Sequence, residues 1–176
     1  MIVIIGASAS GKTEISKILK NKYNIKKCIT TTTRPIRKNE VNHVDYHFIT
    51  KEEFETKIQN NEFIEYAIYN NNYYGINKKD IVNNSVVVVE PNGANALIKA
   101  NLDNIFIVFI ETNEQIRKQR MLDRGDNIKD IEKRLQLDKN IFKKENILRI
   151  DLILQNDNID LNILAEQVFQ KYQNCK

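Results

Sequence analysis

Cysteine and proline are scarce in this 176-residue chain, at two residues each, and glycine occurs only five times. Cys28 and Cys175 stand far apart and lack the spacing of metal ligands, so we expect neither a disulfide framework nor a zinc site. No segment is rich enough in proline, glycine and serine to indicate a linker between domains. The sequence therefore predicts one compact domain with insertions.

A long hydrophobic run is also missing. The apolar start reaches Gly6 and Lys12 within a few residues, which is too short for a membrane span and a poor match to a signal peptide. The net charge of +4 is too mild to indicate a nucleic-acid polymer as partner, but it suits an anionic small molecule. We expect a cytoplasmic protein without membrane contact.

The first motif is GASASGKT at positions 6–13. It fits the pattern G-x-x-x-x-G-K-[ST], in which backbone N–H groups wrap a phosphate and the helix N-terminus adds its positive end. In that pattern Lys12 lies beside the β- and γ-phosphates, and Thr13 binds Mg²⁺. The required context is present, because an apolar segment precedes the loop and a helical pattern follows it. A chance glycine turn is the alternative.

Apolar segments alternate with helical patterns along much of the chain. The predicted strands are 2–5, 26–29, 85–90, 105–110 and 152–154, and the predicted helices are 13–22, 92–100, a long charged one from about 113, and 161–172. This alternation predicts an α/β fold with a parallel sheet covered on both faces.

The segment 31–84 has a different texture, with short alternating strands expected at 45–48 and 62–69. NNNYYG is expected to form a turn, and Thr50 with Glu53 forms a capping box at a helix start. We expect a smaller α+β insertion here.

Three later clusters carry candidate chemistry. Arg34, Arg37 and Tyr46 suit a dianionic phosphate, although a solvated basic loop is the simpler interpretation of these residues alone. Glu65 lies in a predicted strand, where a carboxylate needs a partner or faces water. Arginines crowd a predicted helix–turn–helix that breaks at Gly125, either as a solvated helix or as a clamp over phosphates; they are Arg117, Arg120, Arg124 and Arg134.

Taken in order, these motifs resemble guanylate kinases. The similarity covers nearly the whole chain and rests on GASASGKT, TTR with a second arginine three residues on, EVNHVDYHF, FIEYA, NYYG, DRG with KRL downstream, and QNDNID. The resemblance implies a three-layer phosphate-loop core (1–30, 85–123 and 135–176), an inserted GMP-binding domain (31–84) and a helical lid (124–134). It also implies phosphoryl transfer from ATP, with Mg²⁺, to GMP and dGMP.

The resemblance further implies a role for each matching residue. The ATP-binding residues would be Gly6, Ala7, Ser8, Ala9, Ser10, Gly11, Lys12 and Thr13, with Asn156 near the adenine and Thr13 on Mg²⁺. The GMP-binding residues would be Thr30, Arg34, Arg37, Tyr46, Glu65, Tyr74 and Glu90, with Thr30 and Glu65 reading the base. The catalytic residues would be Lys12, Arg37, Arg124 and Arg134.

Departures from the family pattern leave two alternatives open. Val88 and Glu90 stand where the family has aspartates, and Ile76 replaces a small hydroxyl residue. Arg-Pro after the threonines and Tyr-Gly-Ile also resemble the ribose bisphosphate kinases, whose acceptor has no base. Non-catalytic phosphopeptide-binding modules are the second alternative, and the complete phosphate loop disfavours them. The sequence does not fix the oligomeric state.

Overall fold

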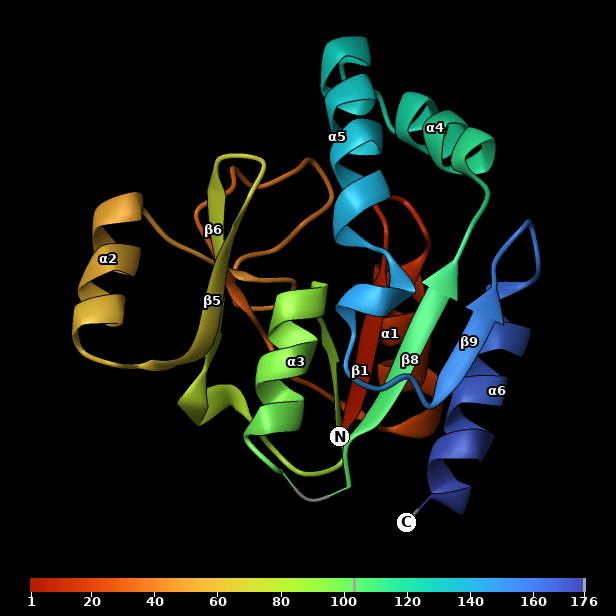
Figure 1. Ribbon diagram of the computed structural model, residues 1–176, viewed down its shortest axis with the longest axis horizontal. Helices are drawn as coiled ribbons and strands as arrows, with labels where there is room; N and C mark the ends of the chain where they lie inside the picture. The colour runs from red at the N-terminus through yellow and green to blue at the C-terminus, as the bar shows by residue number, and fades with distance from the viewer. Residues whose placement is uncertain (103, 176) are drawn as a thin grey trace.

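Figure 1 shows the computed structural model of the chain, which describes residues 1–102 and 104–175. The strands are β1 (Ile2–Gly6), β2 (Lys26–Lys27), β3 (Thr31–Thr32), β4 (His47–Phe48), β5 (Phe63–Tyr69), β6 (Asn72–Asn77), β7 (Ser85–Val88), β8 (Phe106–Glu111) and β9 (Leu152–Gln155). The α-helices are α1 (Lys12–Tyr23), α2 (Lys51–Gln59), α3 (Pro91–Lys99), α4 (Glu114–Asp123), α5 (Ile128–Ile141) and α6 (Leu161–Asn174), and short 3₁₀ helices cover Lys78–Asp80 and Lys144–Asn146.

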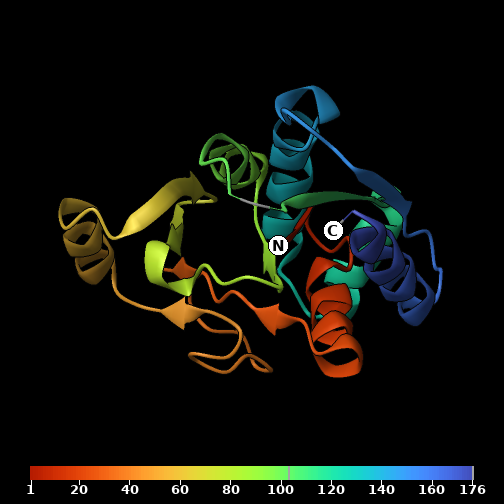
Figure 2. The same ribbon diagram turned by 90° about the horizontal axis from the view of Figure 1, so that it is seen from below.

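The core is a five-stranded parallel sheet in the order β2-β7-β1-β8-β9. Successive side chains of a strand point to opposite faces, and β1 buries both sets. Ile2 and Ile4 pack in the cluster formed with α1 and α6, whereas Val3 and Ile5 pack in the cluster formed with α3. Figure 2 shows α1 and α6 on one side of the sheet and α3 on the other. The predicted α/β fold with a covered parallel sheet is confirmed.

A second sheet of four strands, in the order β4-β3-β6-β5, lies beside the core sheet with α2 on its outer side (Figure 1). Its β5–β6 hairpin turns at Asn70 and Asn71, whose φ angles of 46° and 62° are positive, as tight hairpin turns require. The turn expected in NNNYYG is therefore present but shorter than expected, because two asparagines complete it and Asn72–Asn77 pairs as β6.

Aromatic packing joins α2 to this second sheet. The ring of Phe54 stacks on Phe63 at 4.4 Å and on Tyr73 at 5.0 Å between centroids. Gly75 lies under these rings, and a Cβ there would come within 2.8 Å of Phe54 and Phe63. The close approach explains why the strand carries glycine at this position.

Several elements are shorter than the sequence predicted. The strands expected at 26–29, 45–48 and 85–90 cover only Lys26–Lys27, His47–Phe48 and Ser85–Val88. The last of them stops early because Glu90 is the N-cap of α3 and Pro91 occupies its first turn. Glu90 is thereby held at the carboxyl edge of the core sheet.

The charged region after β8 forms two helices rather than one. Gly125 has φ 82° and follows α4, so the break expected at this glycine is confirmed. The boundaries 31–84 for an insertion and 124–134 for a lid stay predictions. Within the described residues, no helix combines the length and the apolar character that crossing a bilayer requires.

The capping box of α2 gives a stability prediction. Thr50 Oγ1 accepts from the Glu53 N–H at 3.2 Å, and Glu53 Oε2 accepts from the Thr50 N–H at 2.8 Å. Thr50→Ala removes the cap and should lower the free energy of unfolding by about 1 kcal/mol. Chemical denaturation measures this loss. Thr56→Ala, inside the same helix, is the matched control and should cost nothing, because alanine favours helix interiors. Equal losses in the two variants would contradict the capping argument.

Candidate active site

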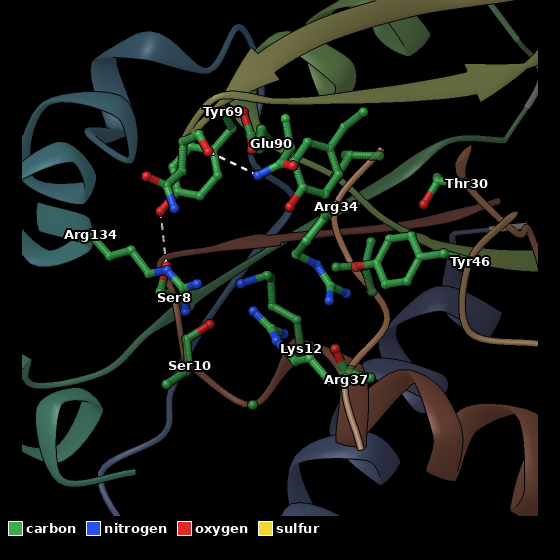
Figure 3. Close-up of a pocket in the computed structure, with 18 of the residues that line it drawn as sticks. Ser8, Ser10, Lys12, Thr30, Arg34, Arg37, Tyr46, Tyr69, Glu90 and Arg134 are labelled. Carbon is green, nitrogen blue, oxygen red and sulfur yellow. Dashed lines mark hydrogen bonds between the residues drawn. The ribbon is translucent and has the colours of Figure 1, made fainter. Parts of the chain in front are cut away.

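A cavity of about 720 Å³ opens where the parallel strands β1 and β7 end, between the second sheet and the helices α4 and α5. Such crevices beyond the carboxyl ends of the strands are the usual ligand sites of open α/β sheets. Sequence-predicted residues on its wall are Ser8, Ala9, Ser10, Gly11, Lys12, Thr13, Thr30, Arg34, Arg37, Tyr46, Tyr74, Glu90, Arg124, Arg134 and Asn156. Figure 3 shows Lys12 and Arg37 directed into this space, with Tyr46 and Thr30 at one end.

The phosphate loop, which is the GASASGKT motif at positions 6–13, connects β1 to α1 and includes residues with positive φ angles. Ala9 and Gly11 have φ angles of 59° and 95°. A Cβ on Gly6 would lie 2.6 Å from the Ile110 carbonyl oxygen, so this position needs glycine although Gly6 and Ala7 are not part of the cavity wall. A Cβ on Gly11 would overlap the side-chain amide nitrogen of Asn156. Both glycines of the motif therefore serve close packing.

Asn156, the residue that follows β9, supports the phosphate loop. Its Nδ2 donates to the Ser10 carbonyl oxygen at 2.7 Å, and its side chain is buried. Arg120 adds a second brace by donating to the carbonyl oxygens of Ala9 at 3.3 Å and Asn156 at 3.2 Å. Asn156, expected near an adenine, thus also fixes the loop itself.

Lys12 lies under the loop and donates from Nζ to the Ala7 carbonyl oxygen at 2.7 Å. Burial lowers the pKa of Lys12 to about 8, and the negative charges of Asp138 and Glu90 partly oppose this shift. A bound polyphosphate brings further negative charge, which favours the ammonium form.

Guanidinium groups gather opposite the loop. Arg34 binds Glu40 at 2.8 Å and stacks 5.4 Å above the ring of Tyr46. Desolvation lowers the pKa of Arg37, and the positive charge of Arg34 lowers it further. Its other positive neighbours are the two arginines expected from the lid, Arg124 and Arg134.

Arg124 and Arg134 are held from the other side of the cavity. Both bind the Asp126 carboxylate, Arg134 at 2.8 Å. Asp126 follows the Gly125 turn, so the break between α4 and α5 places an anion between the two arginines. The structure therefore brings Arg34, Arg37, Arg124 and Arg134 to one cavity, where their mutual repulsion favours an anionic ligand.

Glu65 and Glu90 form the acidic end of the site. Burial raises the pKa of each carboxyl to about 7, and the charge of Glu65 raises that of Glu90 further. Glu90 is on the cavity wall, but Glu65 is not; its Oε2 lies 3.2 Å from where a Cβ of Gly93 would be. Apolar Ile76 and Val88 take part in the wall nearby.

Two residues that the sequence analysis missed, Tyr69 and Asp138, contact the phosphate loop through Ser8. Tyr69 ends the apolar strand β5, and Asp138 belongs to a charged helical run that is typical of a solvated face. Nothing in their local sequence distinguishes them. Only the path of α5 past the loop buries Asp138.

Comparison with known proteins gives the same family over almost the whole chain. The family model for guanylate kinase matches residues 1–171. The chain belongs to the guanylate kinase family. It is 32% identical to the guanylate kinase of Helicobacter pylori, over 91% of this chain and 81% of that protein. It is 33% identical to the guanylate kinase of Clostridium perfringens, over 100% of this chain and 84% of that protein.

The fold agrees with that of a solved guanylate kinase. The crystal structure of guanylate kinase from Anaplasma phagocytophilum matches with a TM-score of 0.72 at 22% identity, over 99% of this chain and 85% of that one. Among the residues that the structure describes, this guanylate kinase family member has no cluster of three or more histidine, cysteine, aspartate or glutamate side chains that could hold a metal ion.

The raised pKa of Glu65 predicts a pH-dependent stability. The folded-state pKa of about 7 lies above the ordinary value of 4.5, so the folded protein keeps a proton that the unfolded chain releases. This contribution to the free energy of unfolding is complete below about pH 4.5 and is lost as the pH rises through 7. Glu65→Gln removes the titration, so its stability relative to wild type should increase from pH 5 to pH 8.

Denaturant unfolding at the two pH values measures this change. Glu62→Gln is the matched control, because Glu62 lies at the surface in an ion pair with Lys57. A stability difference between Glu65→Gln and wild type that is the same at both pH values would contradict the assignment.

Proposed function

We propose that this protein transfers the γ-phosphoryl group of ATP to GMP, giving ADP and GDP, and that it accepts dGMP as well. The observation that carries the proposal is one cavity that brings the phosphate-loop residues Ser8 to Thr13 together with four arginines, Arg34, Arg37, Arg124 and Arg134. Family membership supports the same reaction.

On the donor side, the loop amides and Lys12 bind the ATP phosphates, and Asn156 lies toward the adenine. The residues fit a Mg²⁺ ion that arrives with ATP, because this ion is typically held by one or two protein oxygens together with substrate phosphates. The Thr13 hydroxyl, which lines the cavity, offers such an oxygen. When bound, Mg²⁺ supplies positive charge to the phosphates.

On the acceptor side, Arg34, Arg37, Tyr46 and Tyr74 bind the GMP phosphate. Glu65 accepts from guanine N1–H and the N2 amino group once its carboxylate turns from Gly93 toward the cavity, and Thr30 donates to O6. A charged acceptor facing two donors is a strong pairing, and adenine cannot offer it. Glu90 supports this end of the site.

The chemical step needs no general base. A phosphate monoester is largely dianionic at neutral pH, because its second pKa is about 6. The residues therefore act by alignment and charge neutralisation, with Lys12, Arg37, Arg124 and Arg134 sharing the charge of two substrates that repel each other. Closure of the insertion (31–84) and the lid (124–134) excludes water, which would otherwise accept the phosphoryl group.

A ribose bisphosphate kinase is the second candidate. It is favoured by the apolar side chains of Ile76 and Val88 on the wall and by the position of Glu65 behind Gly93. A sugar acceptor without a base needs no carboxylate at this end.

A substrate panel distinguishes the two candidates. ADP release from ATP is measured with GMP, dGMP, AMP, UMP and a ribose bisphosphate as acceptors. We expect GMP to be preferred over AMP by roughly 10⁴ in kcat/KM, because the site leaves its carboxylate unpaired against adenine. Turnover of the ribose bisphosphate without turnover of GMP would contradict the proposal.

Two variants locate the activity in this cavity. Glu65→Gln should lower kcat/KM for GMP by the equivalent of about 2–3 kcal/mol of transition-state stabilisation, since the amide replaces one charged acceptor oxygen with a donor NH₂ group. Glu62→Gln, the same change at the surface just before β5, should leave kcat/KM for GMP unchanged.

Lys12→Ala should lower kcat about a hundredfold or more with the fold intact. Near-normal turnover by folded Lys12→Ala would contradict the role of the phosphate loop in the reaction.

A further inference from the structure

Asp138 collects four hydrogen bonds at the back of the phosphate loop. Its Oδ1 accepts from the Tyr69 hydroxyl at 2.8 Å and from Ser8 Oγ at 3.4 Å. Its Oδ2 accepts from the Ser8 backbone N–H at 2.8 Å and from Arg117 Nη1 at 2.9 Å. The carboxylate is thus fully partnered, as a buried charge must be.

These partners come from separate parts of the fold. Ser8 lies in the phosphate loop, Arg117 on α4 and Asp138 on α5, whereas Tyr69 is the last residue of β5 in the second sheet. Figure 3 shows Tyr69 next to Ser8, and a dashed line joins the two hydroxyls, which are 3.0 Å apart. One carboxylate therefore ties the second sheet to the donor side of the cavity.

Tyr69 is a polar anchor at the tip of the hairpin, where two of its neighbours on β5 are exposed. The side chains of Tyr66 and Ile68, which precede it on β5, are 45% and 63% exposed. Burial raises the pKa of Tyr69, and the Asp138 charge raises it further, so the phenol keeps its proton and donates to the carboxylate.

Without Tyr69, the remaining three residues (Ser8, Arg117 and Asp138) are still joined by hydrogen bonds. If the hairpin tip moves away, Asp138 still holds the Arg117 guanidinium and the Ser8 N–H. Loss of the Tyr69 hydroxyl bonds therefore leaves no unpaired buried charge at Asp138. The contact can form and break reversibly.

We propose that Tyr69 and Asp138 are positioning residues that hold the second sheet closed against the phosphate loop. The inference rests on the proposed function only in so far as the second sheet binds the acceptor. The latch (Ser8, Tyr69, Arg117 and Asp138) sets the fraction of molecules in which acceptor and donor sides face each other. A charge-assisted hydrogen bond shifts such an equilibrium about tenfold.

A distance measurement tests the latch independently of catalysis. Spin labels are placed at the exposed positions Gln59 on α2 and Lys171 on α6, through cysteine substitutions in a Cys175→Ser background. Cys28 is buried, which raises the pKa of its thiol to about 12, so it does not react. Pulsed electron resonance on the nucleotide-free protein then gives the distribution of label distances.

The variant is Tyr69→Phe, which removes one hydroxyl. We expect a longer distance population that increases several-fold over wild type, and a KM for GMP that rises about three- to tenfold with kcat within twofold. Urea unfolding should change little, which separates positioning from a loss of structure. Tyr73→Phe is the matched control on the same hairpin, because its hydroxyl faces Glu55 outside the cavity. It should match wild type in all three measurements.

Asp138→Asn completes a double-mutant cycle with Tyr69→Phe. If Tyr69 acts through Asp138, Tyr69→Phe should have a much smaller effect in the Asp138→Asn background than in wild type. An equal effect in both backgrounds, or a distance distribution that Tyr69→Phe leaves unchanged, overturns the proposal. If the distances shift as expected but the wild type does not phosphorylate GMP, the proposed function fails and the latch stands.

Discussion

Positive charge is concentrated around one cavity of this protein. Lys12 and five arginines line it, and carboxylates offset only part of their charge, chiefly through Glu40 beside Arg34 and Asp126 between Arg124 and Arg134. Burial lowers the pKa of Lys12 to about 8 and lowers the pKa of Arg37, and the positive charges of neighbouring arginines lower the pKa of Arg37 further. Such an arrangement is favourable when a polyphosphate occupies the space, and the rest of the fold serves to maintain it.

The fold maintains the cavity by rigid elements on each side. The parallel sheet fixes the phosphate loop, which Asn156 and Arg120 brace from behind. Arg34, Arg37 and Tyr46 lie between β3 and β4 of the second sheet, and the arginines of the opposite wall follow α4 or lie on α5. Asp138 connects these bodies through Ser8, Tyr69 and Arg117, so one buried carboxylate aligns groups that lie as much as 130 positions apart in sequence.

Local patterns predicted the features that depend on neighbours in sequence. The strand–loop–helix context of GASASGKT, the apolar core strands and the Thr50 capping box are confirmed, because spacing over a few residues determines them. The hairpin turn is shorter than predicted because two asparagines suffice for it. Asp138 and Tyr69 were missed because their partners lie far along the chain, and the role of Glu65 stays a prediction, because its carboxylate lies beside Gly93 and off the cavity wall. Burial of this kind follows from tertiary packing alone.

The central claim is that donor and acceptor share one cavity, and a bisubstrate compound tests it most directly. Adenosine and guanosine joined 5′ to 5′ by five phosphates span both sides at once. Calorimetric titration should give one bound molecule per chain, and either ATP alone or GMP alone should displace it competitively. Displacement by ATP but not by GMP would show that the guanosine end has no place in this cavity, and would contradict the account.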